Sequence, residues 1–167
     1  MAGVSAPAQD VADTAAAAFA APALPPMDPV LVEILCSEVA QHLETIRGAL
    51  RGADGDLPID EPLLRAVHTL HGAIAMVDIP SLSGILSPLE SWFKRLRALD
   101  RPVPAEHASA LAQSADVIEQ VAAQFDVDHP VLPDTSALTA RLEQLRDDLP
   151  EPQMAHPLYA GLTEAED

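Results

Sequence analysis

Positive charge and aromatic side chains are both scarce in this chain of 167 residues. Nine Lys and Arg stand against 26 Asp and Glu, which gives a formal net charge of −17. Binding to a nucleic-acid backbone needs a basic face, so this balance argues against DNA or RNA as a partner. Three Phe, one Trp and one Tyr are too few for a platform that stacks single-stranded bases.

Cysteine and long apolar runs are also missing. The single cysteine, Cys36, excludes a disulfide framework and a Cys-based zinc site, and its helical spacing predicts a buried thiol. The longest apolar run, over residues 15–23, is shorter than the roughly 20 residues of a membrane span. No basic residue precedes this run, so it does not resemble a secretory signal. We therefore expect a cytoplasmic protein with no membrane partner.

The composition divides the chain into three parts. Residues 1–27 are rich in Ala and Pro and predict a linker or a disordered segment. Residues 151–167 form an acidic, Pro-containing tail, and residues 28–150 carry the folded part. Two linker-like ends suggest that the folded part belongs to a larger multidomain chain.

The folded part shows helical periodicity throughout, because its apolar residues recur at steps of three and four. Asp28 before Pro29 and Asp134 before the last helix are typical helix-capping residues, and Pro88 should kink the third helix. We predict an all-α, up-and-down antiparallel four-helix bundle with an additional C-terminal helix. The helices are expected over about 28–52, 60–77, 81–100, 104–125 and 134–150.

One histidine of the second helix falls on the solvent side. The apolar stripe of this helix centres near Leu70 and Ile74, and His68 lies roughly 140° away at 100° per residue. His68 should therefore face water, with His71 on the flank of the same face.

Small residues follow His68 on that face, namely Gly72 and Ala75. A glycine inside an exposed helix costs about 1 kcal/mol relative to alanine. Two explanations remain open: drift on a tolerant surface, or a need for space beside His68 where a partner protein docks.

The segment His68 to Ala73 (HTLHGA) resembles the H-x-L-K-G-[SA] signature of histidine-containing phosphotransfer (HPt) domains. The resemblance covers roughly residues 28–126. It is closest to the HPt modules of CheA-type chemosensory kinases, including ChpA-like kinases of type IV pilus systems, which would place the chain in chemotaxis or twitching motility.

The resemblance implies a phosphorelay intermediate. His68 would accept a phosphoryl group from a histidine kinase core or a phospho-receiver, and would pass it to the aspartate of a response-regulator receiver domain. CheA-type domains place a glutamate 22 residues after the histidine to hold Nδ1–H, which corresponds to Glu90 here. The domain itself would bind no cofactor and has no ATP-binding domain, so Mg²⁺ and ATP are expected on the kinase partner.

Two departures from the family leave the activity open. His71 stands in place of the signature lysine, and Asp78 stands where a glycine is often found. Arg65, three residues before His68, is either a source of positive charge on the same face or a plain surface arginine. Three basic residues lie near the C-terminal end of the third helix, namely Lys94, Arg95 and Arg97. Their positive charge either stabilises that helix end or forms a docking patch for an acidic receiver face. A phosphorylation-silent bundle that only binds a partner is therefore the alternative.

A metal site is a more remote alternative. His68 and His71 together with Glu90, and with His42 as a further ligand, would offer nitrogen and oxygen atoms to zinc. Helical zinc motifs usually space their histidines by four residues rather than three, so we expect no metal.

Overall fold

The computed structural model describes residues 24–152, so the predicted linker (1–27) and tail (151–167) lie almost wholly outside the described residues. The described part contains five α-helices and one 3₁₀ turn, η1, at Ala105–His107. The α-helices are α2 (Pro29–Gly52), α3 (Glu61–Val77), α4 (Pro80–Ala98), α5 (Ala108–Ala122) and α6 (Ser136–Asp147). No strand is present between residues 24 and 152.

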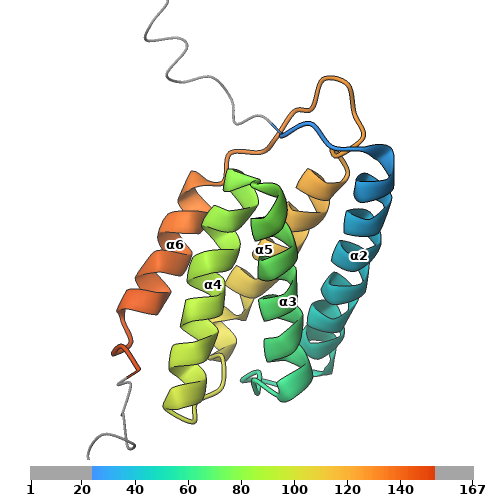
Figure 1. The fold of residues 1–167 in the computed structure, drawn as a ribbon. Coiled ribbons are helices and arrows are strands. Elements are labelled where there is room, and N and C mark those ends of the chain that lie inside the picture. The colour runs from blue at the N-terminus through green and yellow to red at the C-terminus, as the bar shows by residue number, and fades with distance from the viewer. Residues whose placement is uncertain (1–23, 153–167) are drawn as a thin grey trace, which may run out of the picture.

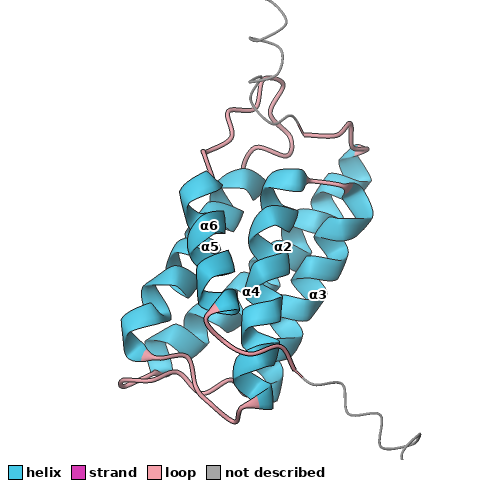
Figure 2. Cartoon of the chain, turned by 90° about the vertical axis from the view of Figure 1, so that its left-hand side faces the viewer, coloured by secondary structure: helices cyan, strands magenta, loops and turns pink. Residues whose placement is uncertain are grey.

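Each helix runs antiparallel to the one before it (Figure 1). Helices α2 to α5 form a four-helix bundle, and α6 packs mainly along α4. Figure 2 shows that the helix axes are roughly aligned, with the loops gathered at the two ends of the bundle. The predicted fold, an up-and-down bundle with an additional C-terminal helix, is confirmed.

The core consists of the apolar stripes that the periodicity predicts. On α3, Leu63, Val67, Leu70 and Ile74 are fully buried. Helix α4 has the most buried residues, because α3, α5 and α6 all pack against it. Pro88 is among them, and the helix continues through it without a break. None of the helices in the described range is both long and apolar enough to cross a membrane.

Aspartates begin and end the helix that carries His68. Asp60 Oδ1 accepts a hydrogen bond of 2.9 Å from Leu63 N, which satisfies one of the free N–H groups of the first turn of α3. Asp78 ends α3 in the left-handed conformation, with φ of 56°. Glycine is the residue most often found in this conformation, and Asp tolerates it better than most. Asp78 therefore fits the backbone at the position where the family often has a glycine.

The end of the bundle near the start of α5 differs from the prediction. Helix α5 begins at Ala108 rather than at 104, because η1 precedes it, and it ends at Ala122 before the buried Phe125. The loop before η1 is instead held by an isolated antiparallel bridge between Leu57 and Val103, with two hydrogen bonds of 2.8 Å. Such a pairing of two distant loop residues leaves no trace in helical periodicity.

Cys36, which was predicted to be buried, is only partly buried on α2, with Sγ 3.9 Å from the carbonyl oxygen of Ala122. Burial, and after it the charge of Asp126, raises the pKa of the thiol. The thiolate, which is the reactive form, is therefore disfavoured.

The cap of α3 gives a test of how the helix that carries His68 is stabilised. Replacing Asp60 with alanine removes the acceptor for Leu63 N and should lower the free energy of unfolding by about 1 kcal/mol. Urea denaturation at neutral pH measures this. Asp54→Ala, at an exposed position of the preceding loop, removes the same charge and should change the stability little. Equal effects of the two variants would contradict the capping role.

Candidate functional site

His68 and Glu90 meet across the contact between α3 and α4, near the middle of both helices. Figure 1 shows these two helices side by side. The His68 side chain is 68% exposed, on the face that the periodicity assigns to it, whereas the Glu90 side chain is 7% exposed. A buried carboxylate thus lies under an exposed imidazole. Buried charges in proteins are normally paired, which directs attention to the partners of Glu90.

Three side chains converge on the Glu90 carboxylate. His68 Nδ1 lies 2.5 Å from Oε1, and His71 Nδ1 is bonded to Oε2. Lys94 Nζ lies 3.0 Å from Oε1, the same oxygen that His68 contacts. Helical spacing explains the arrangement: His68 and His71 are one turn apart on α3, and Lys94 is one turn after Glu90 on α4.

The environment keeps Glu90 ionised. Burial on its own would raise the pKa of this carboxyl, but hydrogen bonds from His71 and His68, followed by the ammonium of Lys94, outweigh it and lower the pKa to about 2. An ionised carboxylate only accepts hydrogen bonds, so each histidine must donate from Nδ1–H. In a neutral imidazole the other nitrogen then carries the lone pair. Glu90 therefore leaves Nε2 of His68 as the ring nitrogen with the free lone pair.

The surface beside His68 is open. Gly72 is exposed, and a Cβ added there would meet nothing within 4 Å. Packing among residues 24–152 therefore gives no reason for glycine at this position. Ala75 and Met76 are exposed farther along α3, and Arg65 is exposed one turn before His68, with only a long ion pair of 3.8 Å to Glu61.

The two arginines at the end of α4 bond to the backbone of other elements. Arg95 Nη1 donates to the carbonyl oxygens of Arg146 and Leu149 at 2.9 and 3.0 Å, and so holds the end of α6. Arg97 donates to the carbonyl oxygen of Ile59 at 2.9 Å in the loop before α3. Both arginines thus serve the fold, and only Lys94 reaches the Glu90 cluster.

The geometry does not favour the metal alternative. Within residues 24–152, no three or more His, Cys, Asp or Glu side chains, the Glu90 cluster included, are arranged so that they could hold a metal ion. His42 pairs with Glu38 on its own helix at 3.1 Å, and both imidazoles of α3 direct Nδ1 at Glu90 as hydrogen-bond donors.

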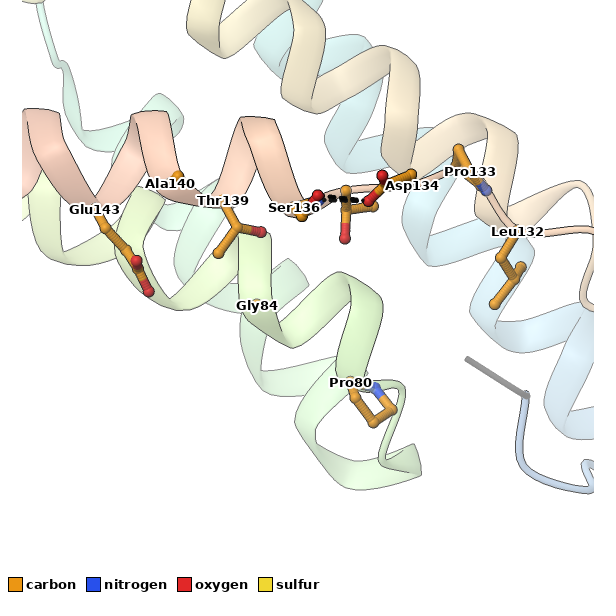
Figure 3. A pocket seen from close by; sticks show the side chains of 10 residues that line it. Pro80, Gly84, Leu132, Pro133, Asp134, Ser136, Thr139, Ala140 and Glu143 are labelled. Carbon is orange, nitrogen blue, oxygen red and sulfur yellow. Dashed lines mark hydrogen bonds between the residues drawn. The ribbon is translucent and has the colours of Figure 1, made fainter. Parts of the chain in front are cut away.

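A surface depression of about 590 Å³ lies elsewhere (Figure 3). It is lined by the start of α4, the loop before α6 and α6 itself, and none of the residues around Glu90 takes part. Its Asp134 carboxylate already accepts hydrogen bonds from Ser136 N and Oγ at 3.0 and 2.7 Å (Figure 3). The cluster around Glu90 therefore remains the candidate site.

The model of the Hpt domain family matches residues 30–148, which is more than half of the chain. The chain belongs to the Hpt domain family. The matched residues include the whole of α3 to α6 and nearly all of α2. Membership supports a general role in two-component phosphorelays, with histidine kinases and response regulators as the general partners. Searches of curated proteins and of solved structures gave no match.

Sequence reasoning missed two parts of this Hpt site. Lys94 was grouped with the neighbouring arginines, although its spacing of four residues from Glu90 places both on one helical face. The second hydrogen bond of Glu90, from His71, was also not foreseen, because it requires the two helices to be in a definite register. That register is visible only in the packing of α3 on α4.

The lowered pKa of Glu90 predicts an acid dependence of stability. The unfolded chain takes up a proton at this carboxyl near pH 4.5, whereas the folded chain does so only near pH 2. The stabilisation from the cluster should be complete above pH 4.5 and should be lost as the pH falls towards 2. Urea unfolding of the wild type and of Glu90→Gln at pH 6.5, 4.5 and 3 should show a stability deficit that shrinks at pH 3.

Glu33→Gln, at an exposed position of α2, is the matched control and should cost little at all three pH values. A deficit of Glu90→Gln that stays the same from pH 6.5 to pH 3 would show that the carboxylate charge does not stabilise the fold.

Proposed function

We propose that His68 is the phosphoacceptor of this Hpt domain, and that it relays a phosphoryl group from a histidine kinase core or a phospho-receiver to the aspartate of a response regulator. One observation carries the proposal: the exposed imidazole of His68 donates Nδ1–H to the buried, ionised Glu90, which leaves Nε2 free towards solvent. Family membership independently supports phosphotransfer in general.

The chemical step needs little from this chain. The lone pair of Nε2 attacks the phosphorus atom of the donor, a bond between Nε2 and phosphorus forms, and the bond from phosphorus to the leaving oxygen breaks. The electron pair leaves with that oxygen, on ADP or on the receiver carboxylate. The ring keeps Nδ1–H and becomes an imidazolium, whose positive charge Glu90 stabilises at 2.5 Å. Transfer to the receiver is the reverse of this step.

The donor protein supplies the remaining chemistry in this proposal. ATP and Mg²⁺ belong to the kinase catalytic domain, because phosphoryl transfer from ATP relies on metal ions and phosphate-binding loops. The resemblance of the HTLHGA segment to CheA-type and ChpA-like modules favours a cytoplasmic chemosensory or type IV pilus pathway, and a larger multidomain chain as the setting. The phosphorylation-silent bundle is the alternative that the first experiment below decides.

Phosphorylation at His68 is directly testable. Purified domain incubated with potassium phosphoramidate, a small phosphoryl donor, and separately with a phosphorylated receiver, should gain one phosphate that is labile in acid and stable in base. His68→Gln should gain none, by intact mass and by phosphate-affinity electrophoresis. His129→Gln, at an exposed loop position, should behave like the wild type.

Unlabelled wild type would overturn the proposal and favour the silent bundle. A label that survives His68→Gln would place the nucleophile at another residue.

Gly72 should serve partner access rather than folding. Gly72→Ala should raise the free energy of unfolding by about 0.5–1 kcal/mol, because a Cβ meets nothing within the chain and alanine favours helix. Gly72→Gln should slow transfer to or from a receiver at least tenfold while labelling by phosphoramidate stays unchanged, since the small donor needs no docking surface. If receiver transfer by Gly72→Gln matched the wild type, glycine at this position would reflect surface drift alone.

A further inference from the structure

A phosphoryl group on His68 would add negative charge beside Glu90, and the lysine of the family signature that would balance this charge is missing here. Phosphorylation would place about two negative charges close to the ionised Glu90, in a chain whose formal net charge is already −17. The signature lysine that would offset this charge is absent, and His71 takes its place on α3. His71 Nδ1–H is already used on Glu90 Oε2, so the compensating cation must come from elsewhere.

Of the basic residues around the site, one is placed to supply that charge. Arg95 and Arg97 are bonded to backbone carbonyls of other elements. Arg65 is near His68 in sequence but extends towards Glu61. Lys94 differs from these, because its ammonium binds Oε1, the same carboxylate oxygen that accepts His68 Nδ1–H.

The side chain of Lys94 also has the freedom that the role requires. It is 56% exposed, whereas the carboxylate it contacts is 7% exposed. A lysine has a flexible four-carbon stem with three rotatable donors, so its ammonium can move a short distance without disturbing the helix. The ammonium therefore lies beside the imidazole on the solvent side of the buried carboxylate.

From these contacts we infer that Lys94 of α4 is the cation that binds the phosphoryl oxygens on His68, and that it replaces the signature lysine of α3. This inference rests on the proposed function of His68. In the resting domain Lys94 neutralises Glu90. When the bond between Nε2 and phosphorus forms, the ammonium turns from Oε1 to a phosphoryl oxygen, while Nδ1–H stays on Oε1.

Two residues, His71 and Lys94, thus together replace the missing lysine. His71 holds Oε2 and so keeps the carboxylate oriented between the two helices. Lys94 supplies the mobile positive charge at Oε1. Compared with the family signature, the positive charge lies on α4, which carries Glu90, instead of α3, which carries His68. It stays on the same face of the bundle.

Lys94→Gln tests the inference with phosphoramidate as donor, so that no partner protein affects the result. The initial rate of His68 phosphorylation should fall about tenfold, because a charge-assisted contact to the phosphoryl group is lost. Lys94→Arg, which keeps the positive charge, should retain most of the rate. The double variant His71→Lys with Lys94→Gln returns the cation to α3 and should recover activity relative to Lys94→Gln alone.

Arg51→Gln is the matched charge control. Arg51 is 63% exposed, is paired with Glu44 on α2, and is one positive charge of the same chain. Its loss should leave the phosphorylation rate unchanged. Nitrogen-15 NMR of the His68 ring should show that Nδ1–H persists in Lys94→Gln, which separates loss of the cation from loss of the tautomer.

The outcomes distinguish this inference from the function on which it rests. If the wild type is phosphorylated at His68 and Lys94→Gln reacts at the same rate, the role of Lys94 is wrong and the phosphoacceptor stands. If Lys94→Gln is slow and Lys94→Arg is equally slow, Lys94 does not act through its charge and has a structural role only. If the wild type gains no phosphate from either donor, both proposals are overturned.

Discussion

The structure of the site depends on one carboxylate. Glu90 is buried between α3 and α4, yet it stays ionised because two imidazoles and one ammonium contact its two oxygens. A buried charge without such partners would cost several kcal/mol. The same contacts determine which nitrogen of His68 is free. Stability of the helix contact and the tautomer of the His68 imidazole therefore have a common origin.

The rest of the bundle places this carboxylate. Helix α4 packs against α3, α5 and α6, so the buried side chain of Glu90 has little room to shift. The α3 face opposite the stripe from Leu63 to Ile74 remains open to solvent, and it holds His68. An ordinary helical bundle thus gives a buried carboxylate beneath an accessible ring, and helices carry both side chains.

Much of the fold could be predicted from the sequence, because helical periodicity and capping are local signals. The stripes of α3 and α4, the cap at Asp28 and the solvent side of His68 all follow from spacing alone. Glu90 was proposed from the family spacing, not from periodicity. Lys94 and the second contact of His71 depend on how two helices meet, and the bridge from Leu57 to Val103 joins residues 46 positions apart. Such features require the three-dimensional packing.

The end of α6 is bonded to α4 at the residue next to Lys94. Arg95 lies next to Lys94 in the sequence, and its guanidinium donates hydrogen bonds to the carbonyl oxygens of Arg146 and Leu149 at the end of α6. Arg95 and Lys94 are neighbours on α4, so a shift at the end of α6 would be passed to the helix that also carries Glu90. The end of α6 and the Glu90 cluster are thus connected through one helix, α4.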